Sequence, residues 1–275
     1  MQIPELKLVC KDLRKEIIKM LHAAGSGHPG GSLSSVEIAA SLYFNHMNFN
    51  PSNPQDPLRD YFILSKGHAA PVLYAVLAKL ECIKNEELCT LRKLGSRLQG
   101  HPASDKGVSG IEISTGSLGY GLGVGAGIAK GIKTRGGKNR VYVLMGDGEQ
   151  QEGSIWEAAM AAAHFKLDNL CAIVDYNNLQ IDGKVSDVMG IEPIADKYKA
   201  FGFNVLSIDG HNLEEIDAAL KTYKLTTDKP TAIIAKTVKG KGVSFMEHNA
   251  DWHGKVPNAE IADKAIAEID ACAQK

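Results

Sequence analysis

The sequence predicts an α/β fold in which a doubly wound, mostly parallel sheet carries helices on both faces. The clearest sign is a strand, a helix and a strand in succession, where an alanine-rich stretch from Ser154 to Lys166 separates two short apolar runs, Val141 to Met145 and Leu170 to Val174. The same alternation recurs later in the chain: Phe203 to Ile208, Leu213 to Tyr223 and Thr231 to Thr237. Parallel strands need helical crossovers of this kind, so the repetition favours a covered parallel sheet.

The N-terminal half supplies further elements of the same fold. Residues 5 to 24 have the periodicity of an amphipathic helix, which ends in a glycine-rich turn over residues 24 to 31. A second helix is expected from Ser34 to His46, and Tyr61 to Leu64 reads as a short buried strand. Small residues dominate from Gly116 to Gly131, which predicts a helix whose backbone approaches a neighbour closely. No linker interrupts the chain, so residues 1–275 are predicted to form one domain.

Composition excludes several classes of function. The chain has 275 residues, 44% hydrophobic and 23% charged, with a net charge of -1 and no block of like charge, so neither nucleic acid nor a membrane surface is an expected partner. The five cysteines are scattered and never form a Cys-x-x-Cys pair, which argues against a disulfide framework or a zinc site. Charged residues interrupt the N-terminal apolar positions, so no signal peptide is predicted and we expect a cytoplasmic protein.

Two polar motifs follow neighbouring strands of the predicted sheet. Gly146-Asp147-Gly148 follows one strand, and Asn177 follows the next strand along the chain. Ligands of such sheets bind beyond the carboxyl ends of the strands, where a carboxylate and an amide oxygen would meet. These two oxygens are an incomplete set for a small hard cation, which phosphate oxygens and a backbone carbonyl would complete. The pattern therefore predicts magnesium bound together with a diphosphate.

Competing interpretations of these glycines are weaker. Gly-Asp-Gly alone is also an ordinary tight turn. The chain has no Gly-x-x-x-x-Gly-Lys-Ser/Thr motif, and the nearest dinucleotide fingerprint, Gly121-x-Gly123-x-x-Ala126, follows no convincing strand. A nicotinamide enzyme is therefore not favoured.

Four histidines lie in loops marked by glycine or proline. They are His28 in Ser-Gly-His-Pro, His68 in Ser-Lys-Gly-His, His101 in Gly-His-Pro and His253 in Trp-His-Gly. A single loop histidine is often only solvent-exposed. Four in such turns indicate proton transfer or recognition of hydroxyl groups.

The chain resembles the thiamine-diphosphate enzymes, whose signature is Gly-Asp-Gly followed, roughly thirty residues later, by Asn. It resembles specifically the N-terminal half of transketolase. The four histidine contexts carry the closer resemblance, with Ser114-Thr115-Gly116-Ser117-Leu118-Gly119 and Lys239-Gly240-Lys241-Gly242. The resemblance covers nearly the whole chain. It implies the thiamine-diphosphate-binding fold, with Mg²⁺ (Ca²⁺ or Mn²⁺ as substitutes) held by Asp147, the side chain of Asn177 and the carbonyl of Leu179.

The resemblance also implies roles for further residues. The four histidines would surround the donor sugar and the reactive carbon of the cofactor. Eight residues would lie along the cofactor: His68, Gly116, Ser117, Leu118, Gly148, Asn177, Lys239 and His253. Glu152 matches an interface glutamate that couples paired active sites, although a solvated carboxylate at a helix start explains it nearly as well. The remaining histidines are interpreted as structural, and no cofactor contact is assigned to Gly31, where some relatives place a serine.

The implied reaction is transfer of a two-carbon ketol unit from a ketose phosphate to an aldose phosphate, as in the pentose phosphate pathway, with the cofactor as electron sink. Transketolases place the glutamate that activates the aminopyrimidine, and the residues that grip the sugar phosphate, in a later domain, which this chain lacks. We therefore expect a separate C-terminal subunit in an α2β2 heterotetramer, or else a truncated form of a longer protein. Two other interpretations remain open: an E1 alpha subunit of a 2-oxo acid dehydrogenase, and a catalytically silent cofactor-binding module.

Overall fold

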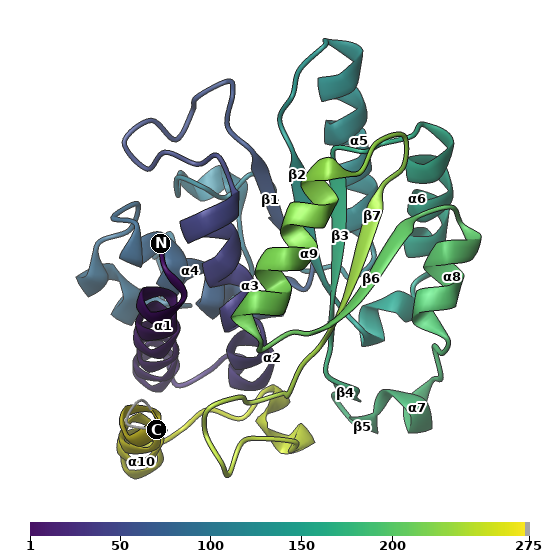
Figure 1. Cartoon of the computed structure of the whole chain (residues 1–275). Coiled ribbons are helices and arrows are strands. Elements are labelled where there is room, and N and C mark those ends of the chain that lie inside the picture. The colour runs from purple at the N-terminus through teal and green to yellow at the C-terminus, as the bar shows by residue number, and fades with distance from the viewer. Residues whose placement is uncertain (273–275) are drawn as a thin grey trace.

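The computed structural model describes residues 1–272 and confirms the parallel sheet. Its five strands run parallel to one another in the order β1-β2-β3-β7-β6 (Figure 1). Their bounds are β1 Tyr61–Leu64, β2 Val141–Gly146, β3 Leu170–Tyr176, β6 Asn204–Asp209 and β7 Thr231–Lys236. A small antiparallel pair, β4 Leu179–Gln180 and β5 Gly183–Lys184, follows β3.

Helices occupy most of the remaining chain. The α-helices are α1 Ile3–Ala24, α2 Pro29–Ser34, α3 Val36–Ser41, α4 Ala70–Lys79, α5 Tyr120–Thr134, α6 Gly153–His164, α7 Val185–Val188, α8 Ile194–Ala200, α9 Leu213–Leu225 and α10 Ala259–Cys272. Short 3-10 segments are η2 Gly67–Ala69, η3 Asn85–Thr90, η4 Ser104–Lys106, η5 Gly148–Gln151 and η6 Ala250–His253, and η1 Leu42–His46 is a π-helix.

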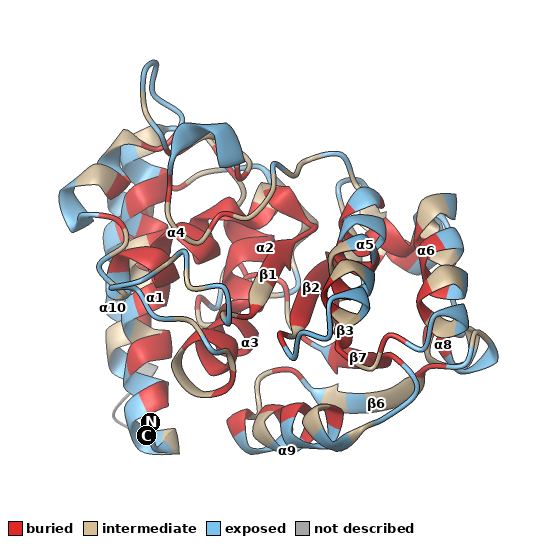
Figure 2. Cartoon of the chain, turned by 90° about the horizontal axis from the view of Figure 1, so that it is seen from above, coloured by how far each residue is buried: buried red, intermediate tan, exposed pale blue. Residues whose placement is uncertain are grey.

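The sheet is covered on both faces, as the sequence predicted (Figure 2). Helices α5, α6 and α8 pack on one face around buried side chains such as Leu122, Ile155 and Tyr198. Helices α1, α3, α4 and α9 enclose the core on the other face, where Leu13 and Leu220 are buried. Because both faces are covered, β2 and β3 are apolar along nearly their whole length.

The helix predicted from Ser34 to His46 is interrupted and starts earlier. Pro29 is the first residue of α2. Proline suits this position because the first backbone N–H groups of a helix have no partner within the helix. The Ser35 hydroxyl then donates to the carbonyl of Gly31, and the chain turns at Ser35 into α3 and η1. The turn that was expected over residues 24–31 ends at His28, which is the residue immediately before α2.

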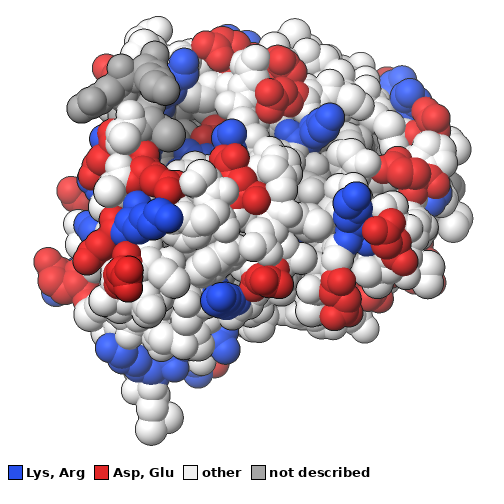
Figure 3. Space-filling model, turned by 90° about the horizontal axis from the view of Figure 1, so that it is seen from below, with Lys and Arg blue, Asp and Glu red and all other residues white. Residues whose placement is uncertain are grey.

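The carboxyl ends of four neighbouring strands meet at one edge of the sheet. The parallel register sets Gly146 of β2 opposite Asp175 of β3, and Tyr176 of β3 opposite Lys236 of β7. The residues that follow these strands are thereby brought level with one another. On the face of the molecule seen from below, acidic and basic side chains are interspersed, with no large patch of one sign (Figure 3).

None of the helices within residues 1–272 has the length and apolarity needed to cross a membrane.

Candidate active site

A cavity of about 290 Å³ opens at the carboxyl ends of β1, β2 and β3. Most residues singled out from the sequence line it: His28, His68, Gly116, Leu118, Asp147, Gly148, Glu152, Asn177, Leu179, Lys239 and His253. The segments that carry them are far apart in the chain, from the start of α2 to the loop after β7. The structure therefore brings these positions to one place.

The four loop histidines form a cluster around His28. The ring centroid of His28 lies 5.4 Å from that of His68, 5.3 Å from that of His253 and 6.4 Å from that of His101. His68 and His253 are 5.2 Å apart. The buried Nδ1 of His28 has no hydrogen-bond partner in the described chain, which leaves it free for a bound molecule.

Burial keeps these histidines neutral at pH 7. It lowers the pKa of His28 to about 4, with help from His101 and Arg92, and lowers that of His253 to about 3, with help from Lys239. The pKa values of His68 and His101 are lowered as well, mainly by burial. Neutral imidazoles can accept a proton from a hydroxyl group or donate a hydrogen bond to a developing alkoxide.

Asp147, Asn177 and Leu179 present oxygen atoms at the inner end of the cavity. Asp147 is 3% exposed, and burial together with nearby Asp175 raises its pKa to about 6. Among residues 1–272, its carboxylate accepts hydrogen bonds only from the backbone N–H groups of Gly148 and Asn178. The amide nitrogen of Asn177 donates to Asp175 at 3.2 Å, and its amide oxygen accepts the backbone N–H of Leu179 at 3.1 Å, which leaves that oxygen one further lone pair.

Lys239 reaches the same end of the cavity from the loop after β7. Its ammonium donates to the carbonyl oxygen of Leu179 at 3.0 Å and to Nδ1 of His253 at 2.8 Å. Burial and the neighbouring Lys66 lower the pKa of Lys239 to about 8. A positive charge therefore already lies beside one of the three predicted metal ligands.

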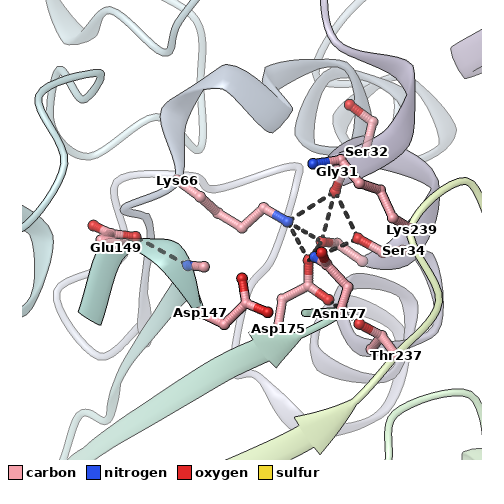
Figure 4. A network of polar contacts seen from close by, with 12 residues as sticks. Gly31, Ser32, Ser34, Lys66, Asp147, Glu149, Asp175, Asn177, Thr237 and Lys239 are labelled. Atoms are coloured by element: carbon pink, nitrogen blue, oxygen red, sulfur yellow. Dashed lines mark hydrogen bonds and ion pairs between the residues drawn. The ribbon is translucent and has the colours of Figure 1, made fainter. Parts of the chain in front are cut away.

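A buried ion pair joins Lys66, which lines the cavity, to Asp175 (Figure 4). Asp175 also accepts hydrogen bonds from the hydroxyls of Ser34 and Thr237. Burial opposes its ionisation, but Lys66 and these hydroxyls together keep the pKa of Asp175 below its usual value. Asp175 is thus fully satisfied, whereas Asp147 beside it has no comparable positive partner in the described chain.

Glu149 is a third buried carboxylate at the site, and it holds the loop before α5. It accepts the backbone N–H of Gly119 at 2.9 Å and that of Gly146 at 3.0 Å, together with the hydroxyl of Ser65. Burial raises the pKa of Glu149, and these three donors oppose the rise. The loop that carries Gly116 and Leu118 is thereby tied to the ends of β1 and β2.

Two glycines of the site lie close to neighbouring side chains, and at Gly30 the backbone oxygen of Trp252, 2.9 Å from a Cβ placed there, blocks any larger residue. A Cβ on Gly30 would lie 2.8 Å from Cγ of Lys239, and one on Gly148 would lie 2.9 Å from the Gln180 side chain. Gly31 lies against His68 and Lys66, and its carbonyl accepts the Lys66 ammonium at 2.9 Å. Neither residue of the Gly30-Gly31 pair had a predicted role.

Three of the predicted site residues lie at the margin of this arrangement. Ser117 lines a neighbouring surface cavity instead of this one. His101 contacts the cluster through His28, and it packs on Gly116. Glu152 is exposed at the start of α6. Within residues 1–272, no three His, Cys, Asp or Glu side chains converge as a metal cluster would, so a metal bound at Asp147 would need phosphate oxygens to complete its ligands.

Lys66, Asp175 and Glu149 were not predicted from the sequence as residues of the site. Asp175 gave one detectable signal, because it is an acidic residue inside an otherwise apolar strand. Glu149 follows Gly-Asp-Gly directly and reads as an exposed turn residue. Its burial depends on Ser65 and Gly119, which are distant in sequence.

Comparison with known proteins identifies the relatives of this chain. Residues 7–269 match the family model described as transketolase, thiamine diphosphate binding domain. The chain is 44% identical to an apulose-4-phosphate transketolase subunit from Phocaeicola vulgatus, covering 100% of this chain and 97% of the relative. It is 43% identical to a 6-deoxy-6-sulfo-D-fructose transketolase subunit from a Clostridium species, covering 94% of each.

Transketolases made as one longer chain match as well. The human transketolase is 42% identical over 98% of this chain and 42% of its own length. The crystal structure of transketolase from Campylobacter jejuni superimposes with a TM-score of 0.91 at 36% identity, over 98% of this chain and 43% of that one. The chain therefore spans nearly all of the subunit relatives but less than half of these longer enzymes.

Proposed function

The chain belongs to the transketolase family, as its thiamine diphosphate binding domain, and we propose that it is the N-terminal subunit of a two-chain transketolase. In this function it transfers a two-carbon ketol unit from a ketose phosphate to an aldose phosphate. The observation that carries the proposal is the near-complete coverage of two relatives that are named as transketolase subunits. The sequence left two alternatives open, an E1 alpha subunit and a silent module, and the matched family favours neither.

The polar groups at the inner end of the cavity fit a metal diphosphate. Asp147 is a buried carboxylate without a cationic partner of its own among the described residues, and a bound Mg²⁺ would stabilise its ionised form. The buried Gln180 amide nitrogen also has no partner in the described chain and lines the cavity, as a donor to a phosphate oxygen would. Asp147, the Asn177 amide oxygen and the Leu179 carbonyl would hold the metal, and Lys239 and Gln180 would face the diphosphate.

When bound, thiamine diphosphate supplies the electron sink for breaking and forming the carbon-carbon bond. The chain's own residues bind and orient the sugar. Neutral His28 accepts the proton of a donor hydroxyl at Nδ1. The Nδ1 of His253 already accepts the Lys239 ammonium, so His253 donates from Nε2, as His68 and His101 donate, to oxygen atoms that gain negative charge. Gly116 and Leu118 would lie along the cofactor, and the Glu149 side chain fixes the loop that carries them.

A second subunit completes the site in this proposal. Helices α5 and α6 expose apolar side chains beside the cavity, with Tyr120 65% exposed and Met160 58% exposed. Exposed apolar residues on two neighbouring helices suit a protein interface. A C-terminal transketolase subunit docked there would supply the glutamate for the aminopyrimidine ring and the groups for the sugar phosphate, in an α2β2 assembly in which Glu152 links paired sites.

The reaction itself separates the proposal from its main rival. The chain is mixed with its C-terminal subunit, Mg²⁺ and thiamine diphosphate, and is then given either xylulose 5-phosphate with ribose 5-phosphate or pyruvate with an artificial electron acceptor. The proposal expects two-carbon transfer between the sugars and no release of carbon dioxide from pyruvate. Release of carbon dioxide without sugar transfer would instead assign the chain to the 2-oxo acid dehydrogenases.

A further inference from the structure

The segment from Thr237 to Lys239 carries the chain from β7 into the cavity, and each of its residues is anchored. The Thr237 hydroxyl donates to Asp175, and the Lys239 ammonium donates to Leu179 and His253. Between them, the backbone N–H of Val238 donates to Nε2 of His211 at 2.8 Å. His211 is therefore the partner of the residue that immediately precedes Lys239.

These contacts define the tautomer of His211. Because Nε2 accepts the Val238 N–H, it carries no proton, and the ring proton is on Nδ1. Nδ1 lies 2.9 Å from the carboxylate of Glu37 and donates to it. Both nitrogens of His211 are thus committed, and the residue does not line the cavity that His28, His68 and His253 line.

Glu37 is itself held in place from the opposite side. It lies in α3, is 7% exposed, and accepts the Arg14 guanidinium at 2.8 Å. Burial opposes ionisation of Glu37, but Arg14 and His211 outweigh it and lower its pKa, so Glu37 is an anion at neutral pH. Arg14 also donates to the carbonyl of Lys241 at 3.0 Å, beyond Lys239 along the same loop.

His211 and Arg14 therefore hydrogen-bond to the loop on both sides of Lys239, at Val238 and at Lys241. A long side chain such as lysine loses rotamer entropy when it is fixed, so a backbone that already directs the ammonium into place lowers that cost. Gly30 adds to this constraint, because a side chain there would collide with Lys239.

We propose that His211 is a positioning residue for Lys239. Glu37 holds His211 as the Nδ1–H tautomer, and Nε2 of His211 then fixes the Val238 amide and, through it, the Lys239 ammonium at the diphosphate end of the cavity. Only the last clause rests on the proposed function, since the hydrogen bond between His211 and Val238 exists whatever the cavity binds.

The first measurement is amide hydrogen exchange of Val238 in the chain without cofactor. His211→Phe keeps a ring but removes the acceptor, and exchange at Val238 is expected to accelerate at least ten-fold. His211→Gln offers a side-chain oxygen to Val238 and an N–H to Glu37, and it is expected to restore most of the protection. His22→Phe, at an exposed histidine of α1, is the matched control and is expected to exchange as wild type does.

The second measurement is calorimetric binding of thiamine diphosphate with Mg²⁺ to the complete assembly. His211→Phe is expected to weaken binding at least ten-fold while kcat at saturating cofactor stays within about two-fold of wild type, and His211→Gln is expected to recover affinity. His211→Leu serves as a second variant without an acceptor should the phenylalanine not fold.

Wild-type exchange at Val238 in a folded variant without an acceptor overturns the proposal. Faster exchange with unchanged cofactor affinity overturns the link from His211 to Lys239. If the wild-type assembly binds no cofactor, the proposed function fails, and the exchange measurement still tests the hydrogen bond between His211 and Val238.

Discussion

The Lys239 ammonium lies 3.0 Å from the carbonyl oxygen of Leu179, so in the protein alone a lysine occupies the place beside a predicted metal ligand. Asp147, whose pKa burial raises to about 6, faces the same end of the cavity. The site thus holds a buried carboxylate without an ion-pair partner in the described chain, and a buried ammonium near it. In our account, a metal held by Asp147, Asn177 and Leu179 would leave Lys239 to face the diphosphate.

Replacing Asp147 with Asn should weaken cofactor binding that depends on magnesium. The substitution keeps the size of the side chain but removes the only carboxylate of the proposed metal set, so affinity for thiamine diphosphate and Mg²⁺ in the assembly should fall at least ten-fold. Titration calorimetry measures the change, with Asp263→Asn on the exposed surface of α10 as control. Unchanged affinity in Asp147→Asn would remove this residue from the metal site.

Replacing His28 or His101 with Ala should impair catalysis more than folding. Nδ1 of His28 is buried without a partner in the described chain, so it is available to the substrate. We expect kcat/KM for the donor ketose to fall ten-fold or more, about 1.4 kcal/mol per decade, with a nearly unchanged melting temperature. His22→Ala is the control. Wild-type kinetics in both variants would show that the cluster does not contact the substrate.

Replacing Glu149 with Ala should destabilise the chain. The backbone N–H groups of Gly119 and Gly146 would lose a buried acceptor, and each unpaired group costs about 1–3 kcal/mol. Urea unfolding should show a loss of about 2–4 kcal/mol, and Glu149→Gln should lose less because an oxygen remains. The exposed Glu157→Ala should unfold as wild type does. If Glu149→Ala matched that control, the clamp on the Gly116 loop would not exist.

The histidine cluster should make the fold sensitive to acid. Burial lowers the pKa of His28 to about 4 and that of His253 to about 3, whereas an unfolded histidine takes up a proton near pH 6.5. Between about pH 6.5 and 4 the unfolded state therefore binds more protons than the folded state, and stability falls as the pH falls.

In that window, each such histidine lowers the free energy of unfolding by up to about 1.4 kcal/mol for each unit by which the pH falls. His253→Gln should consequently lose less stability than wild type between pH 7.5 and pH 5, as measured by urea unfolding at both values. His164→Gln, at an exposed histidine, is the control. An equal loss in His253→Gln and wild type would mean that His253 is protonated in the folded protein.

Local patterns predicted the parts of the structure that depend on periodicity. The strands β2 and β3 and the helix between them follow from two apolar runs and an alanine-rich stretch, and their parallel pairing brings Asp147 near Asn177. The break at Ser35 was not predicted because it depends on a hydrogen bond from the Ser35 hydroxyl to the carbonyl of Gly31. The early start of the helix at Pro29 was not predicted either. Proline at the first turn was the available signal.

Long-range pairing explains what the sequence did not predict in the site. Lys66 and Asp175 are 109 residues apart and meet only because β1, β2 and β3 are neighbours in the sheet. The partners of Glu149 and His211 likewise come from other loops. His211 was interpreted as structural from its sequence, and the network with Glu37 and Val238 shows which part of the structure it holds.

The most direct test of the central claim compares the chain alone with the chain plus its C-terminal subunit. Both samples receive Mg²⁺, thiamine diphosphate, xylulose 5-phosphate and ribose 5-phosphate, and size exclusion with light scattering reports the assembly. We predict no measurable two-carbon transfer by the chain alone, and transfer together with a complex of at least two copies of each chain after mixing. Transfer by the isolated chain at about 1 per second or faster would contradict the account.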